Sequence, residues 1–393
     1  MNGPVTVLYV QPSSEIGGSD IALYRLVAEL DRSRYRPVVV LPRDGPLVAN
    51  LRAVDVAVRF LPMLQLRPVR DPAYQLRFAL RFWPSVVRLA RLIRRERAQL
   101  VHSNSLYTFY GMWASWLAGR PHVWHVREIP GGPSVLRSLL ASAVRRGARR
   151  VVPMTYAVAE LFGPRERLPP SVVPIPDGID LREFHPSVSG ARVRAELGID
   201  PGAPVVGFVA RLDPWKGADV FVRAAAEIAL ERPEARFLVC GGELRGYETY
   251  AASVRELASS LGLDGRIQFT GWRYRLGDIP EVMAALDVLL HPTIRPEPFG
   301  LVLVEAMATA RPVVASRAGG IAEVVVDGLT GELVPPGDWR AAAGAVLRLL
   351  ADPARARDLG LAGRIRAEKE FEVGAYVRRI EAVYASLLGE AAI

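Results

Sequence analysis

Two glutamates that could hold a sugar, Glu297 and Glu305, stand eight positions apart with Gly300 between them. The residues after the glycine, 301–309, are mostly apolar and contain no helix breaker, so we predict a helix that begins near Gly300. Glu297 would then lie in the loop before the helix, and Glu305 about two turns inside it. Helix N-termini attract phosphate through unpaired N–H groups, and carboxylates accept hydrogen bonds from sugar hydroxyls. The segment therefore has the groups needed to hold a nucleotide sugar.

Two basic residues, Arg211 and Lys216, follow a predicted strand at 204–209. Lysine occurs at only one other position, Lys369, so nearly all other basic residues are arginines. A diphosphate leaving group gains negative charge as its bond to the sugar breaks, and two fixed cations would stabilise that transition state more than the ground state. The alternative is a solvated pair of charges at the end of a strand. No Asp-x-Asp run lies near these motifs, so this chemistry does not demand a metal ion.

The elements that position these residues are predicted by an alternation of short β-branched runs with longer amphipathic runs. Such alternation indicates βαβ units and parallel sheets covered by helices on both faces. The expected strands are 5–10, 37–41, 56–60, 99–102, 121–125, 149–152, 171–174, 204–209, 235–240, 266–270, 287–291, 312–315 and 331–334. The pattern restarts after a linker at 186–190, and three helical runs close the chain, at 338–351, 354–370 and 373–389. We therefore expect an α/β protein of two doubly wound, Rossmann-like domains facing across a cleft, with the ligand at the carboxyl ends of the strands.

The order and spacing of these motifs resemble those of the retaining nucleotide-sugar glycosyltransferases of family 4, which have the GT-B fold. The resemblance is close along 204–340 and looser over 1–186. It implies an N-terminal acceptor-binding domain at 1–186, a nucleotide-sugar-binding domain at 187–372, and a final helix within 373–393 that crosses back to the first domain.

The same resemblance assigns roles to residues of the second domain. Arg211 and Lys216 would clamp the diphosphate of the donor. Glu297 would hold the hydroxyls of the donor sugar, and Glu305 those of the nucleotide ribose. The backbone that would meet the phosphates and the sugar lies at Phe299, Gly300, Leu301 and Val302.

Glycines mark two further places where a ligand could approach the backbone. Gly241 and the glycine after it follow strand 235–240, and we expect them to line the nucleotide pocket, with the turn at Trp272 flanking the base. In the first domain, Gly17 and Gly18 precede an amphipathic run that Ser19 or Asp20 can cap. An ordinary turn would look the same, but in the family this loop lies beside the donor phosphates and the acceptor.

Among the five histidines, His125 is the informative one, because it stands at the carboxyl end of a predicted strand. A packed polar residue is the alternative, and the family resemblance favours a contact with the donor sugar or the acceptor hydroxyl. His102 ends the preceding predicted strand and could line the acceptor site. The turn at Asp177 matches the family except that asparagine is more usual there, a change that keeps the turn chemistry.

The net charge of +9 is unevenly placed, with many arginines in the stretch 67–97. Aromatic residues are interspersed among them, at Tyr74, Phe78, Phe82 and Trp83. A basic amphipathic helix with aromatic residues suits an anionic membrane surface, although a solvated arginine face is an equal alternative. No recognition motif accompanies the charge, which disfavours nucleic acid as a partner.

Length and composition limit the remaining possibilities. A chain of 393 residues, half of them hydrophobic, can bury the cores of two domains. No apolar stretch approaches the ~18 residues of a spanning helix. No basic leader precedes strand 5–10, and Cys240 is the only cysteine, which excludes an intramolecular disulfide. We expect a cytoplasmic protein, peripheral on the inner face of the membrane if the arginine-rich stretch binds lipid.

We expect a metal-independent hexosyltransferase that needs no cofactor besides its nucleotide diphosphate sugar donor and that acts on a glycan or lipid-linked acceptor, as in polysaccharide biosynthesis. No enzyme nucleophile is evident, so retention would follow the family's usual description, a same-face displacement in which the leaving phosphate takes the acceptor proton. One alternative within the fold is transfer to a small soluble metabolite. A non-catalytic nucleotide-sugar binding protein is disfavoured by the complete set Arg211, Lys216, Glu297 and Glu305, and an epimerase by the spacing of the two glutamates.

Overall fold

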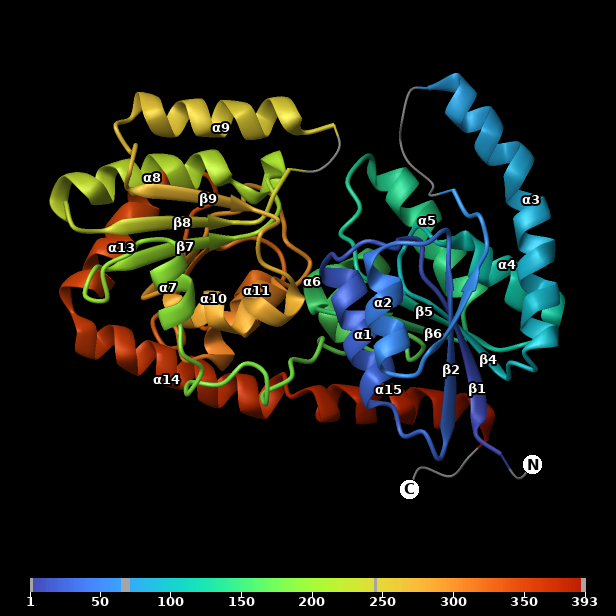
Figure 1. The fold of residues 1–393 in the computed structure, drawn as a ribbon. Coiled ribbons are helices and arrows are strands. Elements are labelled where there is room, and N and C mark those ends of the chain that lie inside the picture. The colour runs from blue at the N-terminus through green and yellow to red at the C-terminus, as the bar shows by residue number, and fades with distance from the viewer. Residues whose placement is uncertain (1–2, 65–70, 244–245, 390–393) are drawn as a thin grey trace. The chain divides into compact units, whose positions relative to one another are not determined.

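The computed structural model describes residues 3–64, 71–243 and 246–389. The chain divides into two compact units, an N-terminal unit of Met1–Gly178 with Val373–Ile393 and a C-terminal unit of Ile179–Glu372. Each unit contains a six-stranded parallel sheet with helices on both faces (Figure 1). The expected α/β fold with two doubly wound sheets is confirmed.

The sheet of the N-terminal unit has the strand order β3-β2-β1-β4-β5-β6, and its strands are paired in parallel. The strands are β1 Val5–Val10, β2 Tyr35–Leu41, β3 Ala57–Phe60, β4 Leu100–Ser103, β5 His122–Val126 and β6 Arg150–Pro153. Valine-rich strands such as β1 and β2 suit a sheet that is buried on both faces. The order reverses between β1 and β4, so their carboxyl ends form the switch point where open α/β sheets bind ligands.

Helices pack on both faces of this sheet and form two apolar cores. One core contains residues of α1 Gly18–Glu29, α2 Pro46–Ala53 and α15 Val373–Leu388, and the other contains residues of α3 Pro72–Arg95 and α4 Phe109–Ala118. The remaining helices of the unit are α5 Ser134–Gly147, α6 Tyr156–Ala159 and two short 3-10 helices at Glu160–Phe162 and Arg165–Arg167.

The sheet of the C-terminal unit has the order β12-β11-β10-β7-β8-β9, so its switch point lies between β7 and β10. The strands are β7 Val205–Val209, β8 Arg236–Cys240, β9 Ile267–Gly271, β10 Val288–His291, β11 Val313–Ser316 and β12 Glu332–Val334. An apolar core joins one face to α8 Ala218–Glu231, α9 Glu248–Ser260 and α13 Trp339–Ala351. On the other face lie α7 Ala191–Glu196, α10 Ile279–Ala285, α11 Leu301–Ala308 and α14 Pro353–Glu370 (Figure 1). Shorter helices are η3 Pro214–Lys216, η4 Leu276–Asp278 and α12 Ile321–Val324.

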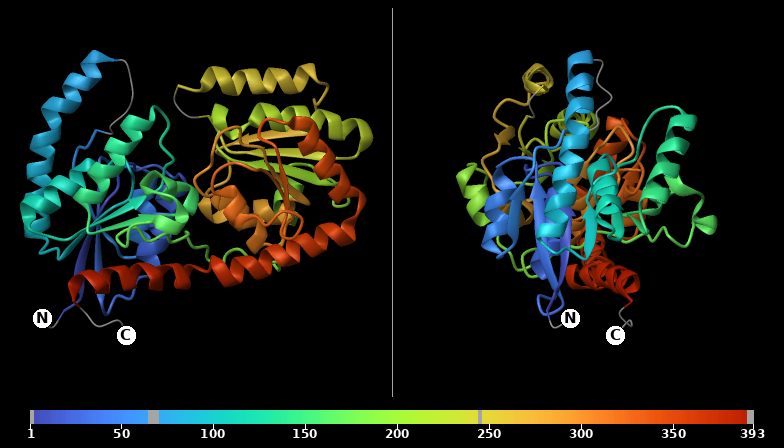
Figure 2. Two further views of the ribbon diagram at one scale, coloured as in Figure 1. Left: turned by 180° about the vertical axis from the view of Figure 1, so that it is seen from behind. Right: turned by 90° about the vertical axis from the view of Figure 1, so that its right-hand side faces the viewer.

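The last helix, α15, completes the core of the N-terminal unit although it lies at the end of the chain. Its Tyr384 is fully buried, and the Tyr384 hydroxyl lies 3.0 Å from that of Tyr9 on β1. The carboxylate of Glu381 accepts a hydrogen bond of 3.0 Å from the backbone N–H of Asp31. Helix α15, the red helix nearest the C-terminus in Figure 2, contacts α1.

One expected strand, 171–174, is wrong. The segment forms only an isolated parallel bridge, between Val172 and Val151 of β6. Prolines at positions 170, 174 and 176 lack the N–H donors that a continuous ladder requires, so the pairing is confined to a few bonds such as that from Val173 N to the Val151 carbonyl, 2.9 Å.

The close approach of Gly178 to α15 gives a test of this packing. A Cβ atom at Gly178 would lie 2.7 Å from Val373 Cα and 2.9 Å from Tyr376 Cβ. Gly178→Ala should therefore lower the free energy of unfolding by about 1–3 kcal/mol, measured by urea denaturation. Gly202→Ala is the control, because nothing lies within 4 Å of its added methyl group. Equal stability of the two variants would show that α15 does not pack tightly at Gly178.

Candidate functional site

An ion pair joins two of the residues singled out in the C-terminal unit. Lys216 ends the short helix η3 after β7, and its Nζ lies 2.6 Å from Oε2 of Glu297, in the loop before α11. Both side chains are largely buried, with exposed fractions of 14% and 9%. The backbone of Glu297 is fixed as well, because its carbonyl accepts a 2.8 Å hydrogen bond from Gly320 N. The structure thus brings together the expected phosphate ligand and the expected sugar ligand.

The charge state of this pair follows from its surroundings. Burial alone would raise the pKa of Glu297, but the Lys216 ammonium and the nearby ring of His291 outweigh burial and lower that pKa to about 2. His291 Nε2 lies 3.6 Å from Glu297 Oε2, and burial lowers the pKa of this histidine, so its ring is neutral at pH 7. Glu297 is therefore a carboxylate at neutral pH.

His291 is a residue of the site to which the sequence assigned no role. It ends β10, next to β7 at the switch point of the sheet, and neither of its buried ring nitrogens has a hydrogen-bond partner among the described residues. The signal that could have identified it is its place at the carboxyl end of a predicted strand, the criterion that selected His125.

A glycine allows the turn after β7 to approach the chain after β10. Gly217 has φ +76°, and a Cβ atom there would overlap the carbonyl oxygen of Pro292. Thr293 adds a hydrogen bond of 2.8 Å from its Oγ1 to the carbonyl of Trp215, whose ring lies 4.0 Å from the Lys216 ammonium. These contacts fix the position of Lys216 relative to β10.

Arg211 differs from Lys216 in its surroundings. It is partly buried just after β7, and its side chain makes no hydrogen bond or ion pair with any residue that the structure describes. The two expected phosphate ligands are therefore not equivalent: Lys216 is already paired with a carboxylate, whereas Arg211 has no charged partner among the described residues.

The helix expected near Gly300 is confirmed as α11, Leu301–Ala308. Gly300 caps it with φ +87°, and the N–H groups of Leu301 and Val302 lie in its first turn, where the helix supplies no partner. The ring of Phe299 is buried against Phe371 at 5.7 Å between centroids, so only the backbone of Phe299 is placed to meet a ligand. Glu305 is buried on α11.

The glycine pair after β8 and the tryptophan after β9 lie together. Gly241 has φ +126°, and its N–H donates to the Gly271 carbonyl at 3.2 Å. A Cβ atom at Gly242 would overlap the ring of Trp272, which is half-exposed and donates from Nε1 to the Glu243 carbonyl at 3.3 Å. The two segments therefore lie together, with the ring of Trp272 half-exposed beside them, and their contact with a nucleotide stays a prediction.

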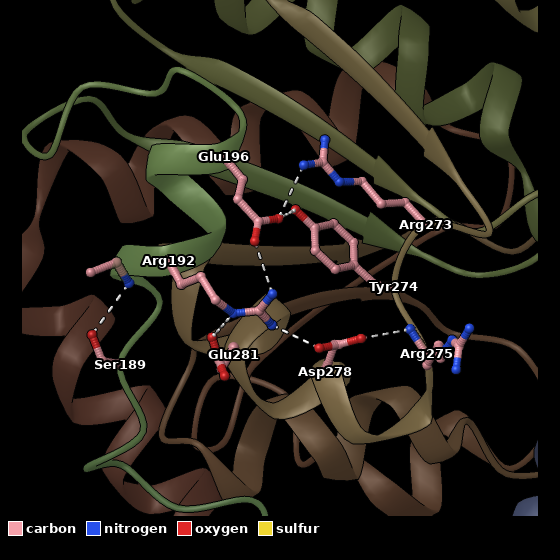
Figure 3. Close-up of polar contacts among 9 residues, drawn as sticks. Ser189, Arg192, Glu196, Arg273, Tyr274, Arg275, Asp278 and Glu281 are labelled. Carbon is pink, nitrogen blue, oxygen red and sulfur yellow. Dashed lines mark hydrogen bonds and ion pairs between the residues drawn. The ribbon is translucent and has the colours of Figure 1, made fainter.

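Arginine–carboxylate contacts hold the loop that carries Trp272 (Figure 3). Arg192 on α7 makes three ion pairs, with Glu196 at 2.9 Å and with Asp278 and Glu281 at 2.7 Å. Glu196 also pairs with Arg273 and accepts from the Tyr274 hydroxyl, both at 3.2 Å. The loop after β9 is thereby anchored to the start of the unit.

In the N-terminal unit, Gly17 and Gly18 stand where the sequence placed them, at the start of α1. Gly17 is the N-cap residue, and the capping carboxylate is that of Asp20, which accepts from Gly17 N at 2.9 Å. Asp20 also accepts a hydrogen bond from Gln11 Nε2. The glycine loop is therefore tied to the end of β1.

His125 is fully buried on β5, and in the part of the chain that the structure describes neither of its ring nitrogens has a hydrogen-bond partner. Its neighbour His102 lies 5.4 Å away between ring centroids and contacts the Tyr384 hydroxyl through Nδ1 at 2.6 Å. Burial, with the charge of Arg127 as a lesser cause, lowers the pKa of both histidines. Both rings are neutral at pH 7, and the contact of either with a ligand stays a prediction.

A second buried ion pair, between Arg127 and Asp177, was not foreseen in the sequence. Their closest atoms lie 2.6 Å apart, and each side chain is 1% exposed. The residues are 50 positions apart, and a pair at that spacing has no signal in a single sequence.

Two further properties concern only the residues that the structure describes. Among them, no three or more His, Cys, Asp or Glu side chains are grouped to hold a metal ion, and no helix has the length and hydropathy needed to span a bilayer. Cys240 is buried, and burial raises the pKa of its thiol to about 11, so it is not a reactive thiolate at pH 7.

Comparison with known proteins gives consistent matches over both units. The family model described as Glycosyl transferases group 1 matches residues 191–366, and the model described as Glycosyltransferase Family 4 matches residues 16–183. The alpha-maltose-1-phosphate synthase of Mycolicibacterium smegmatis is 33% identical, over 92% of this chain and 93% of its own. The D-inositol 3-phosphate glycosyltransferase of Nocardia farcinica is 40% identical, over 48% of this chain and 41% of its own.

A solved structure extends the likeness to the fold. Anabaena Alr3699/HepE in complex with UDP and glucose superimposes with a TM-score of 0.83 at 27% identity, over 97% of this chain and 99% of that one. The same protein has been solved in complex with UDP-glucose.

The contact between Lys216 and Glu297 can be tested by a double-mutant cycle. Lys216→Ala leaves a buried carboxylate unpaired, and Glu297→Gln leaves a buried ammonium unpaired, so each should lower the free energy of unfolding by about 3–5 kcal/mol. The double variant should lose at least ~1 kcal/mol less than the sum, because it removes both charges. The measurement is urea denaturation at pH 7. Additive losses would show that the two side chains do not interact in solution.

Proposed function

This chain belongs to the GT4-like glycosyltransferases with the GT-B fold, and from this we propose that it is a retaining hexosyltransferase with a nucleotide diphosphate sugar as donor. The observation that carries the proposal is the placement of Lys216 against Glu297 in the C-terminal unit, 2.6 Å apart. In this proposal Lys216 is a phosphate ligand and Glu297 a sugar ligand, so the contact would bring the two groups together, with Glu297 in the loop just before α11.

We propose UDP-glucose as the donor. The structurally similar Anabaena protein has been solved with UDP, with glucose and with UDP-glucose. In the present chain the uridine would lie beside Trp272, and Glu305 would accept from the ribose hydroxyls. The diphosphate would meet the first-turn N–H groups of α11 together with Arg211 and Lys216.

The proposed reaction breaks the bond between the anomeric carbon and the β-phosphate oxygen, and the electron pair leaves with the diphosphate. Arg211, Lys216 and the N-terminus of α11 would stabilise the developing negative charge, so no metal ion is required for this step. The acceptor hydroxyl would attack the same face of the sugar and pass its proton to the leaving phosphate, and the configuration would be retained.

For the acceptor, we propose a glycan or lipid-linked acceptor bound by the N-terminal unit. The glycine loop at Gly17 and Gly18 and the neutral side chain of His125 would contact it. A second candidate is a small phosphorylated metabolite, which the names of two relatives favour, a maltose-1-phosphate synthase and an inositol 3-phosphate glycosyltransferase.

An exposed surface on α3 favours the lipid-linked acceptor. Four apolar side chains form one stripe along the helix, at spacings of four, three and four residues, and all are exposed: Leu76, Leu80, Trp83 and Val87. The Trp83 ring packs at a tilt against that of Trp113, with 5.3 Å between centroids, and the neighbouring Trp116 is 72% exposed. The exposed apolar surface of α3 is therefore formed by several side chains and not by a single one, which suits insertion into a lipid surface.

Arginines lie beside this stripe. By helical position, Arg77, Arg81, Arg88, Arg91 and Arg95 fall on the adjacent, exposed side of α3. Two further arginines of the expected basic stretch, Arg67 and Arg70, lie outside the described residues. We propose that this surface binds anionic lipid at the inner face of the membrane, which would bring the enzyme to a lipid-linked acceptor.

The chemistry is tested by transfer from UDP-glucose to a panel of lipid-linked, glycan and phosphorylated sugar acceptors. Lys216→Ala should reduce turnover about 10²–10³-fold, because one lost contact to the leaving group costs ~3–4 kcal/mol of transition-state stabilisation. EDTA should leave turnover unchanged, and NMR should show the donor's anomeric configuration in the product. The matched control is Lys369→Ala, at an exposed position of α14 and the only other lysine.

Three outcomes of this assay would contradict the proposal. Near-normal turnover of folded Lys216→Ala would remove Lys216 from the leaving-group site. Activity abolished by EDTA and restored by Mn²⁺ would assign the neutralising role to a metal. Efficient transfer to phosphorylated metabolites, with none to lipid-linked or glycan acceptors, would favour the second candidate.

Binding of α3 to lipid is tested by co-sedimentation with vesicles. Each arginine near an anionic surface contributes about 1 kcal/mol, so changing Arg81, Arg88 and Arg91 to Gln should weaken binding at least tenfold at low salt. Added salt should weaken binding of the unchanged protein, while the apolar stripe leaves a salt-resistant part. The control changes the exposed Arg340, Arg355 and Arg357 of the C-terminal unit to Gln. If the unchanged protein does not bind anionic vesicles at low salt, the proposed lipid binding is wrong and the arginines of α3 form only a solvated face.

A further inference from the structure

A buried polar network connects the carboxyl ends of three neighbouring strands in the N-terminal unit. The residues directly after β1, β4 and β5 are Gln11, Asn104 and Arg127, and these strands are adjacent in the sheet. All three side chains are at least 96% buried. The network lies at the switch point between β1 and β4, where sheets of this class bind their ligands.

Arg127 is the centre of the network and uses its guanidinium in three directions. Nε donates to Asn104 Oδ1 at 2.6 Å, Nη1 donates to both carboxylate oxygens of Asp177 at 2.8 and 2.6 Å, and Nη2 donates to the Tyr376 hydroxyl at 3.3 Å. Asn104 directly follows β4, and Tyr376 lies on α15. Asp177 lies one residue before Gly178, where the first segment of the unit ends. A planar fork is needed to reach all three, and the single ammonium of a lysine cannot replace it.

The network continues from Arg127 to the glycine loop. Asn104 Nδ2 donates to Gln11 Oε1 at 2.8 Å and to the Ser19 carbonyl at 3.0 Å. Gln11 Nε2 donates to Asp20, whose carboxylate accepts from Gly17 N at 2.9 Å. Each donor in this path has an acceptor, so a shift of the guanidinium would be passed to the start of α1.

We propose that Arg127 and Asn104 are positioning residues that hold the glycine loop, residues 15–18, in the geometry that transfer requires. The role in transfer rests on the proposed function, whereas the effect on the loop does not. Stability alone gives no reason for such a network, because apolar replacements of buried ion pairs are often as stable. A displacement of about 1 Å at a reacting centre, by contrast, can cost on the order of 100-fold in rate.

Two conservative variants test the proposal. Arg127→Lys keeps the charge beside Asp177 but loses the fork. Asn104→Asp keeps the acceptor for Arg127 but loses the donor to Gln11 and Ser19. The control is Arg194→Lys, since Arg194 also combines an ion pair, to Asp287 at 2.7 Å, with bonds to backbone carbonyls, but it pairs at the amino end of β10.

The first measurement needs no substrate. Amide hydrogen exchange over residues 13–19 should be at least tenfold faster in Arg127→Lys and Asn104→Asp than in the unchanged protein and in Arg194→Lys. Unchanged exchange in both variants would overturn the proposal. If Arg127→Lys does not fold, Asn104→Asp decides the result, because the Asn104→Asp variant keeps both residues of the ion pair between Arg127 and Asp177.

The second measurement separates positioning from stability. Turnover of the folded variants should fall at least tenfold, while the rise in melting temperature caused by UDP is kept, because the residues proposed for UDP lie in the other unit. The control should keep turnover within twofold. Turnover of both variants within twofold of the unchanged protein would overturn the role in transfer. Faster exchange in a protein that transfers nothing from any donor would support the positioning and contradict the proposed function.

Discussion

Each sheet of this protein is parallel and covered by helices on both faces, and this constraint decides where polar chemistry can occur. A charged side chain in the middle of such a strand would lose its hydration without gaining a partner. Polar side chains therefore gather where strands end, as Arg127 does after β5 and His291 at the end of β10. Parallel strands end at one edge, so residues as far apart as Lys216 and Glu297, 81 positions, come into contact.

The ion pair between Lys216 and Glu297 also limits how a donor could bind. Both charges are mostly buried, so when a ligand binds one of them, water cannot readily hydrate the other. A diphosphate that binds Lys216 would have to replace the carboxylate, and the sugar hydroxyls would then have to satisfy Glu297. Phosphate and sugar would thus be recognised together, and a free nucleotide would leave this exchange incomplete. Arg211, with no partner among the described residues, would bind phosphate without any such exchange.

The sequence predicted most elements because their signals are local. Runs of valine and isoleucine bounded by turns marked the strands, and the unbroken run after Gly300 marked α11. The segment 171–174 has the same β-branched character, but prolines within and after it remove the donors of a ladder, and it forms only a bridge. The contacts of the site were harder to predict, because a pair such as Arg127 and Asp177 forms through the fold rather than through spacing. The position of His291 at a strand end was visible, but no property of the sequence indicated that it lies beside Glu297.

The packing of Gly178 against Val373 has a consequence for how the protein is made. Ile179 pairs with Glu372 just beyond these residues, so the chain leaves the N-terminal unit and returns to it at neighbouring points. The C-terminal unit is thus an insertion within the N-terminal one. As the chain leaves the ribosome, the first 178 residues appear without α15, and the face that Tyr376 and Tyr384 cover stays open to water. The N-terminal unit can therefore complete its core only when α15 has left the ribosome. By then the whole C-terminal unit has been synthesised.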